Sequence, residues 1–168
     1  MKKLLLGALL LLSMFSFSQT LESDSVDEFT KAHIKATSWE YLQATMSWTL
    51  DSRVRQINDR YILELKLMPI ITHINVSDPT MIKLVNGEFI TIYPNNSQVS
   101  CKGCGAHGFA GSAAYGISIN YELSTLDIEK LKQYGIEKIR IYHDNVYNEF
   151  EIKESKSKRV LDALNILQ

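Results

Sequence analysis

Residues 81–93 read MIKLVNGEFITIY, in which two runs rich in apolar residues flank Asn86-Gly87. Asn-Gly is the dipeptide that a type I′ turn favours, because both central residues of that turn have positive φ. The stretch therefore predicts a β-hairpin with strands over 81–85 and 88–93. The runs on either side of it repeat the same pattern, so this hairpin indicates how the rest of the chain folds.

Two further hairpins are predicted, one on each side. Residues 48–57 and 61–68 are separated by Asn58-Asp59-Arg60, and the second run alternates leucines with charged residues, which is typical of a strand with one buried face. Residues 136–142 and 146–152 form the other hairpin. If Arg140 lies opposite Glu149 there, Ile139 lies opposite Phe150, so charged pairs share one face and apolar pairs the other.

The last third of the chain adds one strand and two helices. Residues 113–121 alternate as a strand does, and Ser124 with Asp127 forms an N-terminal cap for a helix that ends at Gly135. Ser155 or Ser157 is expected to open a second helix, whose apolar stripe is Val160, Leu161, Leu164 and Leu167. The sequence thus predicts an α+β fold: a mostly antiparallel sheet built from sequential hairpins, with two amphipathic helices in a C-terminal βαββα segment.

The N-terminus has the form of a secretory signal. Residues 1–18 read MKKLLLGALLLLSMFSFS, which is a charged start, an apolar run and then small residues at a cleavage position. Its short lysine and leucine pattern is that of a bacterial signal. Removing it leaves 150 of the 168 residues, a length typical of one domain. We expect a single domain over 19–168, with 19–38 as a loosely ordered lead-in because that stretch is acidic and poor in apolar residues.

Composition restricts the classes of partner. The signal contains two of the 18 basic residues and none of the 19 acidic ones, so the mature chain has a net charge of −3. A mildly acidic chain lacks the basic surface that nucleic acid requires. No later segment is long and apolar enough to span a bilayer. We therefore expect a periplasmic or secreted protein without a nucleic-acid partner and without a membrane span after the signal is removed.

The most unusual stretch is 100–116, SCKGCGAHGFAGSAAYG, which contains both cysteines and five of the eight glycines. Cys101 and Cys104 have the C-x-x-C spacing that lets two thiols meet across a tight turn, and Gly103 supplies the backbone freedom for it. Because an exported chain meets an oxidising compartment, the leading interpretation is a small structural disulfide at the base of a long loop. No cofactor is then needed.

Two chemical alternatives remain for the same residues. Cys101, Cys104 and His107 form C-x-x-C-x-x-H, a thiolate and imidazole set that suits zinc or copper, although the fourth ligand of a closed zinc site is not evident. A thiol-redox site is the other alternative. It is disfavoured because such sites place a cysteine at a helix N-terminus, whereas glycines follow Cys104 here.

Tyr142 and Tyr147 are expected on the polar face of the last hairpin, where they could contact a glycan or peptide. No motif assembles a nucleophile, a base and an oxyanion site. The leading hypothesis is therefore a non-enzymatic binding or structural protein of the cell envelope, with an envelope component, a peptide or a glycan as partner. The alternative hypothesis is a metal-binding or thiol-redox protein that uses Cys101, Cys104 and His107.

Overall fold

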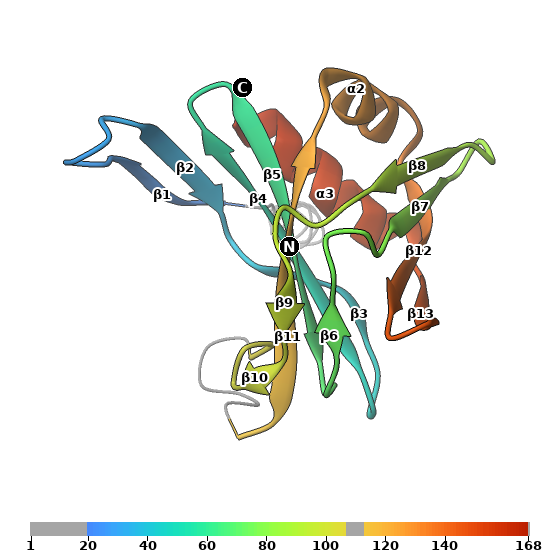
Figure 1. Cartoon of the computed structure of the whole chain (residues 1–168). Helices are drawn as coiled ribbons and strands as arrows, with labels where there is room; N and C mark the ends of the chain where they lie inside the picture. The colour runs from blue at the N-terminus through green and yellow to red at the C-terminus, as the bar shows by residue number, and fades with distance from the viewer. Residues whose placement is uncertain (1–19, 107–112, 168) are drawn as a thin grey trace, which may run out of the picture.

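A computed structural model describes residues 20–106 and 113–167 of the chain. Its largest element is a seven-stranded antiparallel sheet (Figure 1). The strand order is β1 (Leu21–Val26), β2 (His33–Thr37), β4 (Thr49–Ile57), β5 (Arg60–Met68), β11 (Tyr115–Leu123) and β10 (Cys101–Lys102), and β3 (Glu40–Ala44) pairs with the first half of β4. The predicted signal, 1–18, lies outside the described residues.

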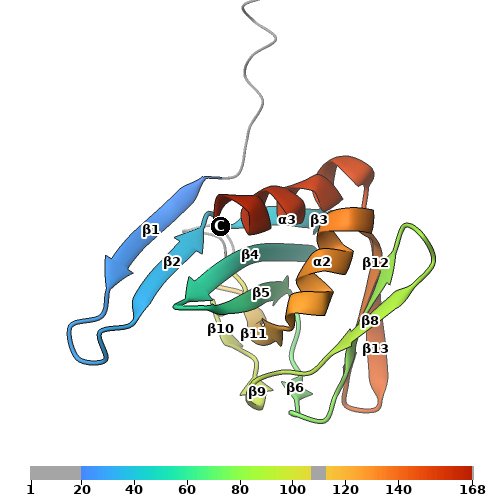
Figure 2. The same ribbon diagram turned by 90° about the horizontal axis from the view of Figure 1, so that it is seen from above.

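A second, four-stranded sheet completes the core. Its order is β13 (Val146–Glu151), β12 (Ile136–His143), β7 (Thr80–Leu84) and β8 (Phe89–Ile92), and a short pair links β6 (His73–Ile74) to β9 (Gln98–Val99). Two helices, α2 (Thr125–Tyr134) and α3 (Glu154–Ile166), lie beside each other, with α3 along β3 and β4. Figure 2 shows them together at one side of the molecule. No helix among the described residues is long and apolar enough to cross a membrane.

One hydrophobic core is shared by both sheets and both helices. Alternate residues of β5 and β11 face it, so Leu65 and Ile119, which are paired neighbours, are both fully buried. Because the period of a strand is two residues, the remaining residues of β5 point to the opposite face of the large sheet. That opposite face carries Glu64 and Lys66.

The predicted α+β class, with its antiparallel hairpins and C-terminal βαββα order, is confirmed. The register of the last hairpin is also as expected, because Arg140 pairs with Glu149 and Ile139 with Phe150. The hairpin at Asn86-Gly87 forms, but the predicted type I′ turn is wrong. Only Gly87 has a positive φ in that turn, 88°, and its N–H donates to the carbonyl of Leu84.

The helix boundaries are partly as predicted. Ser124 caps α2, its hydroxyl accepts from the N–H of Asp127, and Gly135 ends the helix with a φ of 70°. The expected start of α3 at Ser155 or Ser157 is wrong, since the helix begins at Glu154. Ser157 is instead buried inside the helix, where its hydroxyl accepts from the N–H of Ile136 at 2.6 Å.

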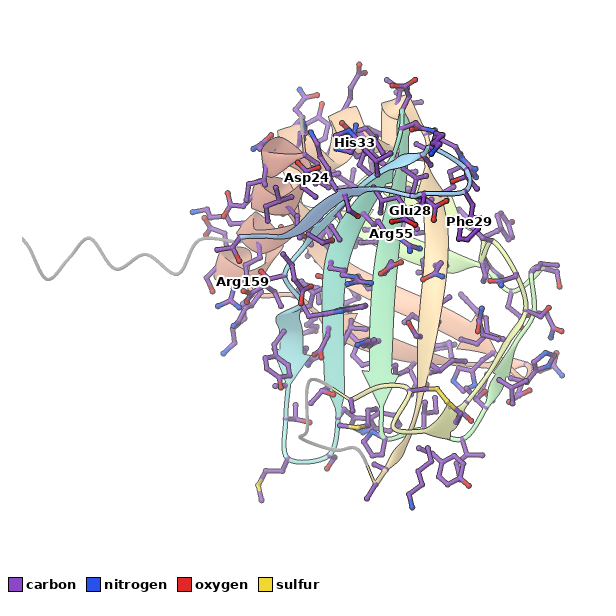
Figure 3. The ribbon with its side chains drawn as sticks, turned by 90° about the vertical axis from the view of Figure 1, so that its left-hand side faces the viewer. Asp24, Glu28, Phe29, His33, Arg55 and Arg159 are labelled. Carbon is purple, nitrogen blue, oxygen red and sulfur yellow. A yellow bond between two sulfur atoms is a disulfide. The ribbon has the colours of Figure 1, made fainter. Side chains whose placement is uncertain are left out.

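Residues 20–38, the described part of the expected loosely ordered lead-in over 19–38, contain β1 and β2, which pair as an antiparallel hairpin. All six residues of β1 are exposed. The low apolar content of this stretch therefore predicted its exposure correctly, but it did not predict that the stretch forms paired strands. Backbone pairing holds this hairpin, and Asp24 and His33 add a side-chain contact of 2.5 Å. In Figure 3 the hairpin runs across the upper part of the molecule, with Phe29 at its turn.

Candidate functional site

The two cysteines lie at disulfide-bonding distance at one end of the large sheet. Their Cα atoms are 5.3 Å apart, within the range that disulfides span. Gly103 between them has a φ of 78°, the left-handed conformation that glycine adopts at little cost. Neither cysteine is left as a free thiol. The pair therefore closes a tight turn immediately before the rest of the glycine-rich stretch.

The metal alternative depends on His107, which lies outside the described residues. Among the residues that are described, no three His, Cys, Asp or Glu side chains gather as metal ligands would. A metal would also need both cysteines as thiolates, whereas in this structure their sulfur atoms are bonded to each other. Thiol titration under native conditions distinguishes these two states of the cysteines.

The cysteine turn packs closely against the sheet at two glycines, Gly105 and Gly116. A Cβ placed on Gly105 would lie 2.7 Å from the carbonyl oxygen of Leu67, and one placed on Gly116 would lie 2.5 Å from the nitrogen of Gly105. Neither position has room for a side chain, because its neighbours are backbone atoms and, at Gly105, also the Cβ of Met68 at 2.7 Å. The chain after Cys104 is thus packed directly on β5 and β11 at the point where β11 begins.

Large apolar side chains are exposed beside this turn. We call the group Met46, Trp48, Ile71 and Tyr115 the apolar end. Met46 is fully exposed, and the exposed fractions of Ile71, Tyr115 and Trp48 are 79%, 47% and 36%. A shallow hollow of about 570 Å³ lies beside Trp48, Ile71 and Tyr115. The described residues that line it are Trp48, Pro69, Ile70, Ile71, Ala113, Ala114 and Tyr115. Exposed apolar side chains gathered around a hollow in this way mark a contact site.

The segments that carry the side chains of the apolar end are held by backbone hydrogen bonds. The turn before β4 is closed by the N–H of Thr45, which donates to the carbonyl of Trp48 at 2.8 Å, and by the N–H of Trp48, which donates to the Thr45 hydroxyl at 3.0 Å. The N–H of Ile70 donates to the carbonyl of Tyr115 at 3.0 Å. The first two bonds fix the turn that carries Met46, and the third joins two segments far apart in the sequence. The exposed side chains are therefore carried by backbone that is held in place.

The segments at the apolar end contain few charges. Its segments, 45–48, 69–71, 99–103 and 113–115, contain one charged residue, Lys102, and no aspartate or glutamate. Lys102 is exposed and lies opposite Tyr115 in the β10–β11 pair. Trp48 also lines a second, smaller hollow together with Glu149. The Glu149 carboxylate already accepts hydrogen bonds from Lys138 and Arg140.

The structure brings the two predicted tyrosines together. Tyr142 and Tyr147 are directly opposite each other in the β12–β13 pair, with ring centroids 5.5 Å apart. The Arg140 guanidinium lies 4.3 Å from the Tyr147 ring. Hydrogen bonds to the Tyr142 hydroxyl and to Glu149 raise the pKa of Arg140. The charged groups on this face are therefore already paired with one another, and the face offers aromatic contact but few unpaired charges.

A cluster that the sequence did not indicate covers the opposite face of the large sheet. Trp39 contacts two cations, with the Arg53 guanidinium 4.6 Å and the Lys66 ammonium 4.0 Å from its ring. Burial, and then the charge of Arg53, lowers the pKa of Lys66. The Lys66 ammonium donates to the carbonyl of Ala106 at 3.2 Å, which ties the cluster to the end of the cysteine turn.

Glu64 neutralises the arginines of this cluster. Its carboxylate is almost fully buried and accepts from Arg53 at 2.5 Å and from Arg55 at 2.7 Å. Arg53 lies opposite Glu64 in the β4–β5 register, so the pair is set by strand pairing. The cluster is a connected network in which each charge has an opposite charge close by, which favours a structural role over capture of a charged ligand.

One hydrogen-bonded set has the residue types of a hydrolase. The Thr72 hydroxyl lies 2.7 Å from Nδ1 of His143, and Nε2 of His143 lies 2.5 Å from the Asn148 side-chain oxygen. Thr72, however, also donates to the Asp144 carboxylate at 2.6 Å, and a hydroxyl has only one proton to give. Thr72 and His143 are both buried. The set therefore ties β6 to the β12–β13 hairpin and does not present a nucleophile.

Comparisons of the chain with protein-family models, curated proteins and solved structures find no match. No residue role is therefore carried over from another protein. The chemistry of the described residues leaves the apolar end, beside the cysteine turn, as the strongest candidate for a contact site.

The cysteine pair is expected to contribute little to stability. Replacing both cysteines, as Cys101→Ser/Cys104→Ser, should lower the free energy of unfolding by about 2 kcal/mol or less, because a disulfide that closes so short a loop removes little entropy from the unfolded chain. Urea unfolding of the variant and the parent measures the difference. A loss of twice that size would mean that the bond holds more of the sheet end than its own turn.

Proposed function

We propose that this chain is an exported, non-enzymatic binding domain of a bacterial cell envelope, periplasmic or secreted, and that the apolar end is its contact surface. The signal pattern of residues 1–18 supports export. The bonded cysteines fit an oxidising compartment. The observation that carries the proposal is the group of large apolar side chains exposed on hydrogen-bonded turns.

Energetics support a contact at this place. Fully burying one large apolar side chain is worth about 1.5 to 3 kcal/mol, so covering Met46, Ile71 and the exposed parts of Trp48 and Tyr115 would stabilise a complex by several kcal/mol. Binding also costs the entropy of ordering the contact residues. That cost is reduced here because the turns that carry these side chains are already fixed by backbone hydrogen bonds and by the close contact of Gly105 with Gly116.

Sedimentation of the mature chain with envelope fractions of the source organism tests the proposal. The chain without residues 1–18 should sediment with the envelope, and Met46→Ser/Ile71→Ser should weaken this binding at least tenfold. Both replaced side chains are exposed, so the fold is expected to survive the change.

The matched control is Phe29→Ser. Phe29 is 94% exposed but lies at the turn of the β1–β2 hairpin, far from the apolar end in Figure 3. Its replacement should leave binding unchanged, as should Tyr147→Ser on the face of the four-stranded sheet. Unimpaired binding by Met46→Ser/Ile71→Ser, or absence of binding by the parent chain, would overturn the proposal.

A further inference from the structure

We propose that the partner of the apolar end is the surface of a lipid bilayer with anionic headgroups, into which the side chains of that end insert while the sheet stays outside. This inference rests on the proposed function and names the envelope component that it leaves open.

The shape of the apolar end suits a planar partner. Its side chains come from three separate places: the turn between β3 and β4, the connection between β5 and β6, and the start of β11. Figure 1 shows these three together at the lower end of the molecule. Met46 and Ile71 are the most exposed of the group, and the hollow between the segments is shallow. Side chains that project from several turns at one end can all enter a flat interface together, whereas a helix or extended peptide requires a groove.

The residue types match the depth profile of a membrane interface. Trp48 and Tyr115 are of the two types enriched at the level of the headgroups, because their rings are apolar and carry one polar group. Met46 and Ile71 have no polar side-chain hydrogen-bonding group that would need water, so they can enter the acyl boundary. Interfacial elements place their apolar side chains about 5 to 10 Å into that boundary.

The charge of the apolar end indicates which lipids it would prefer. Lys102 is the one charged residue in its segments. Two carboxylates lie beside these segments: Glu149 accepts hydrogen bonds from Lys138 and Arg140, and Asp144 accepts from Thr72 and from the N–H of His73. Each lysine close to an anionic surface strengthens binding about fivefold. The chain as a whole is acidic, with a net charge of −1 before the signal is removed, so orientation by Lys102 would also keep the acidic surface away from the bilayer.

Several backbone N–H groups of the apolar end already have hydrogen-bond partners within the protein. Unpaired N–H and C=O groups are costly in a membrane. In the turn before β4 the N–H groups of Thr45 and Trp48 both donate within the turn, and the N–H of Ile70 donates to Tyr115. At these three N–H groups, insertion therefore breaks no hydrogen bond to water.

Vesicle co-sedimentation tests the inference. The mature chain is mixed with vesicles of phosphatidylcholine alone and with vesicles in which a quarter of the lipid is phosphatidylglycerol. We expect binding to the anionic vesicles, loss of at least tenfold in affinity for Met46→Ser/Ile71→Ser, and a loss of about fivefold for Lys102→Gln on anionic vesicles only. Phe29→Ser should bind as the parent does.

The results distinguish this inference from the proposed function. If envelope fractions are bound through Met46 and Ile71 but neither kind of vesicle is bound, the partner is a protein or glycan, so the lipid inference is overturned and the proposed function stands. If neither vesicles nor envelopes are bound, both are overturned. Vesicle binding that Met46→Ser/Ile71→Ser leaves intact would place lipid contact elsewhere and would also overturn the inference.

Discussion

Replacing Gly116 with alanine is expected to lower the free energy of unfolding by about 3 kcal/mol, which is the upper end of the usual cost of overpacking. The new Cβ would lie 2.5 Å from the nitrogen of Gly105 and 2.9 Å from the carbonyl oxygen of Leu67. Both neighbours are backbone atoms, so β5, the cysteine turn or β11 itself must move. Urea unfolding of the purified variant measures the loss, and the same variant should bind envelope fractions more weakly because the apolar end shifts with β11.

Gly87→Ala is the matched control for this substitution. Gly87 has a φ of 88°, but a Cβ there would meet nothing within 4 Å. Its replacement should cost about 1 kcal/mol from backbone strain alone. It should leave binding at the apolar end unchanged. If Gly116→Ala were no more destabilising than Gly87→Ala, the close packing of the cysteine turn on the sheet would be contradicted.

Glu64→Ala is expected to have an effect of similar size, again about 3 kcal/mol, because removing one partner of a buried ion pair leaves the other without compensation. Arg55 would lose the carboxylate that it binds, and Arg53 would keep only the longer contact of 3.5 Å with Glu22. The loss is placed at the lower end of the range for buried pairs because both arginines retain contact with water. Thermal or urea unfolding measures it, and near-ultraviolet circular dichroism reports whether Trp39 loses its fixed surroundings.

Glu122→Ala provides the comparison on the same face of the large sheet. Glu122 pairs with Arg60, but both side chains are exposed. Exposed pairs contribute about 0 to 1 kcal/mol, so this variant should unfold nearly as the parent does. Equal losses for Glu64→Ala and Glu122→Ala would show that burial of the Glu64 network does not matter to stability.

Much of the fold could be predicted from local sequence. The register of the last hairpin follows from matching charges and apolar residues across two short runs, since a slip of one residue would turn Ile139 and Phe150 to solvent. The cap of α2 follows from Ser124 and Asp127, because the hydrogen bonds that they form lie within one turn of helix. In both cases the residues that decide the structure are near one another in the chain.

The parts that sequence could not predict depend on long-range contacts. Asn86-Gly87 specified a hairpin but not its turn type, because a glycine with positive φ serves more than one kind of turn. The Asp144-Asn145 turn, by contrast, has positive φ at both central residues. The β1–β2 hairpin was missed because backbone pairing, which leaves no apolar pattern, holds it.

Only part of the candidate site could be predicted from the sequence. The cysteines and glycines of 100–116 indicated a tied loop, and the structure bonds Cys101 to Cys104. Met46, Trp48 and Ile71 gave no signal, since apolar residues near a strand end are normally core. They form a surface only because β3 and β5 end, and β11 begins, at the same edge of the molecule.

The most direct test of the apolar end as the contact surface is to measure how the polarity around it changes when the chain binds the envelope. A polarity-sensitive dye is attached at Met46→Cys in the disulfide-intact chain, and at Phe29→Cys as the matched position at the other end of the molecule. On addition of envelope fractions, the emission of the dye at position 46 should shift to shorter wavelength, and the emission at position 29 should not change. A shift at position 29 with none at position 46, in chain that sediments with the envelope, would contradict the assignment of the apolar end as the contact surface.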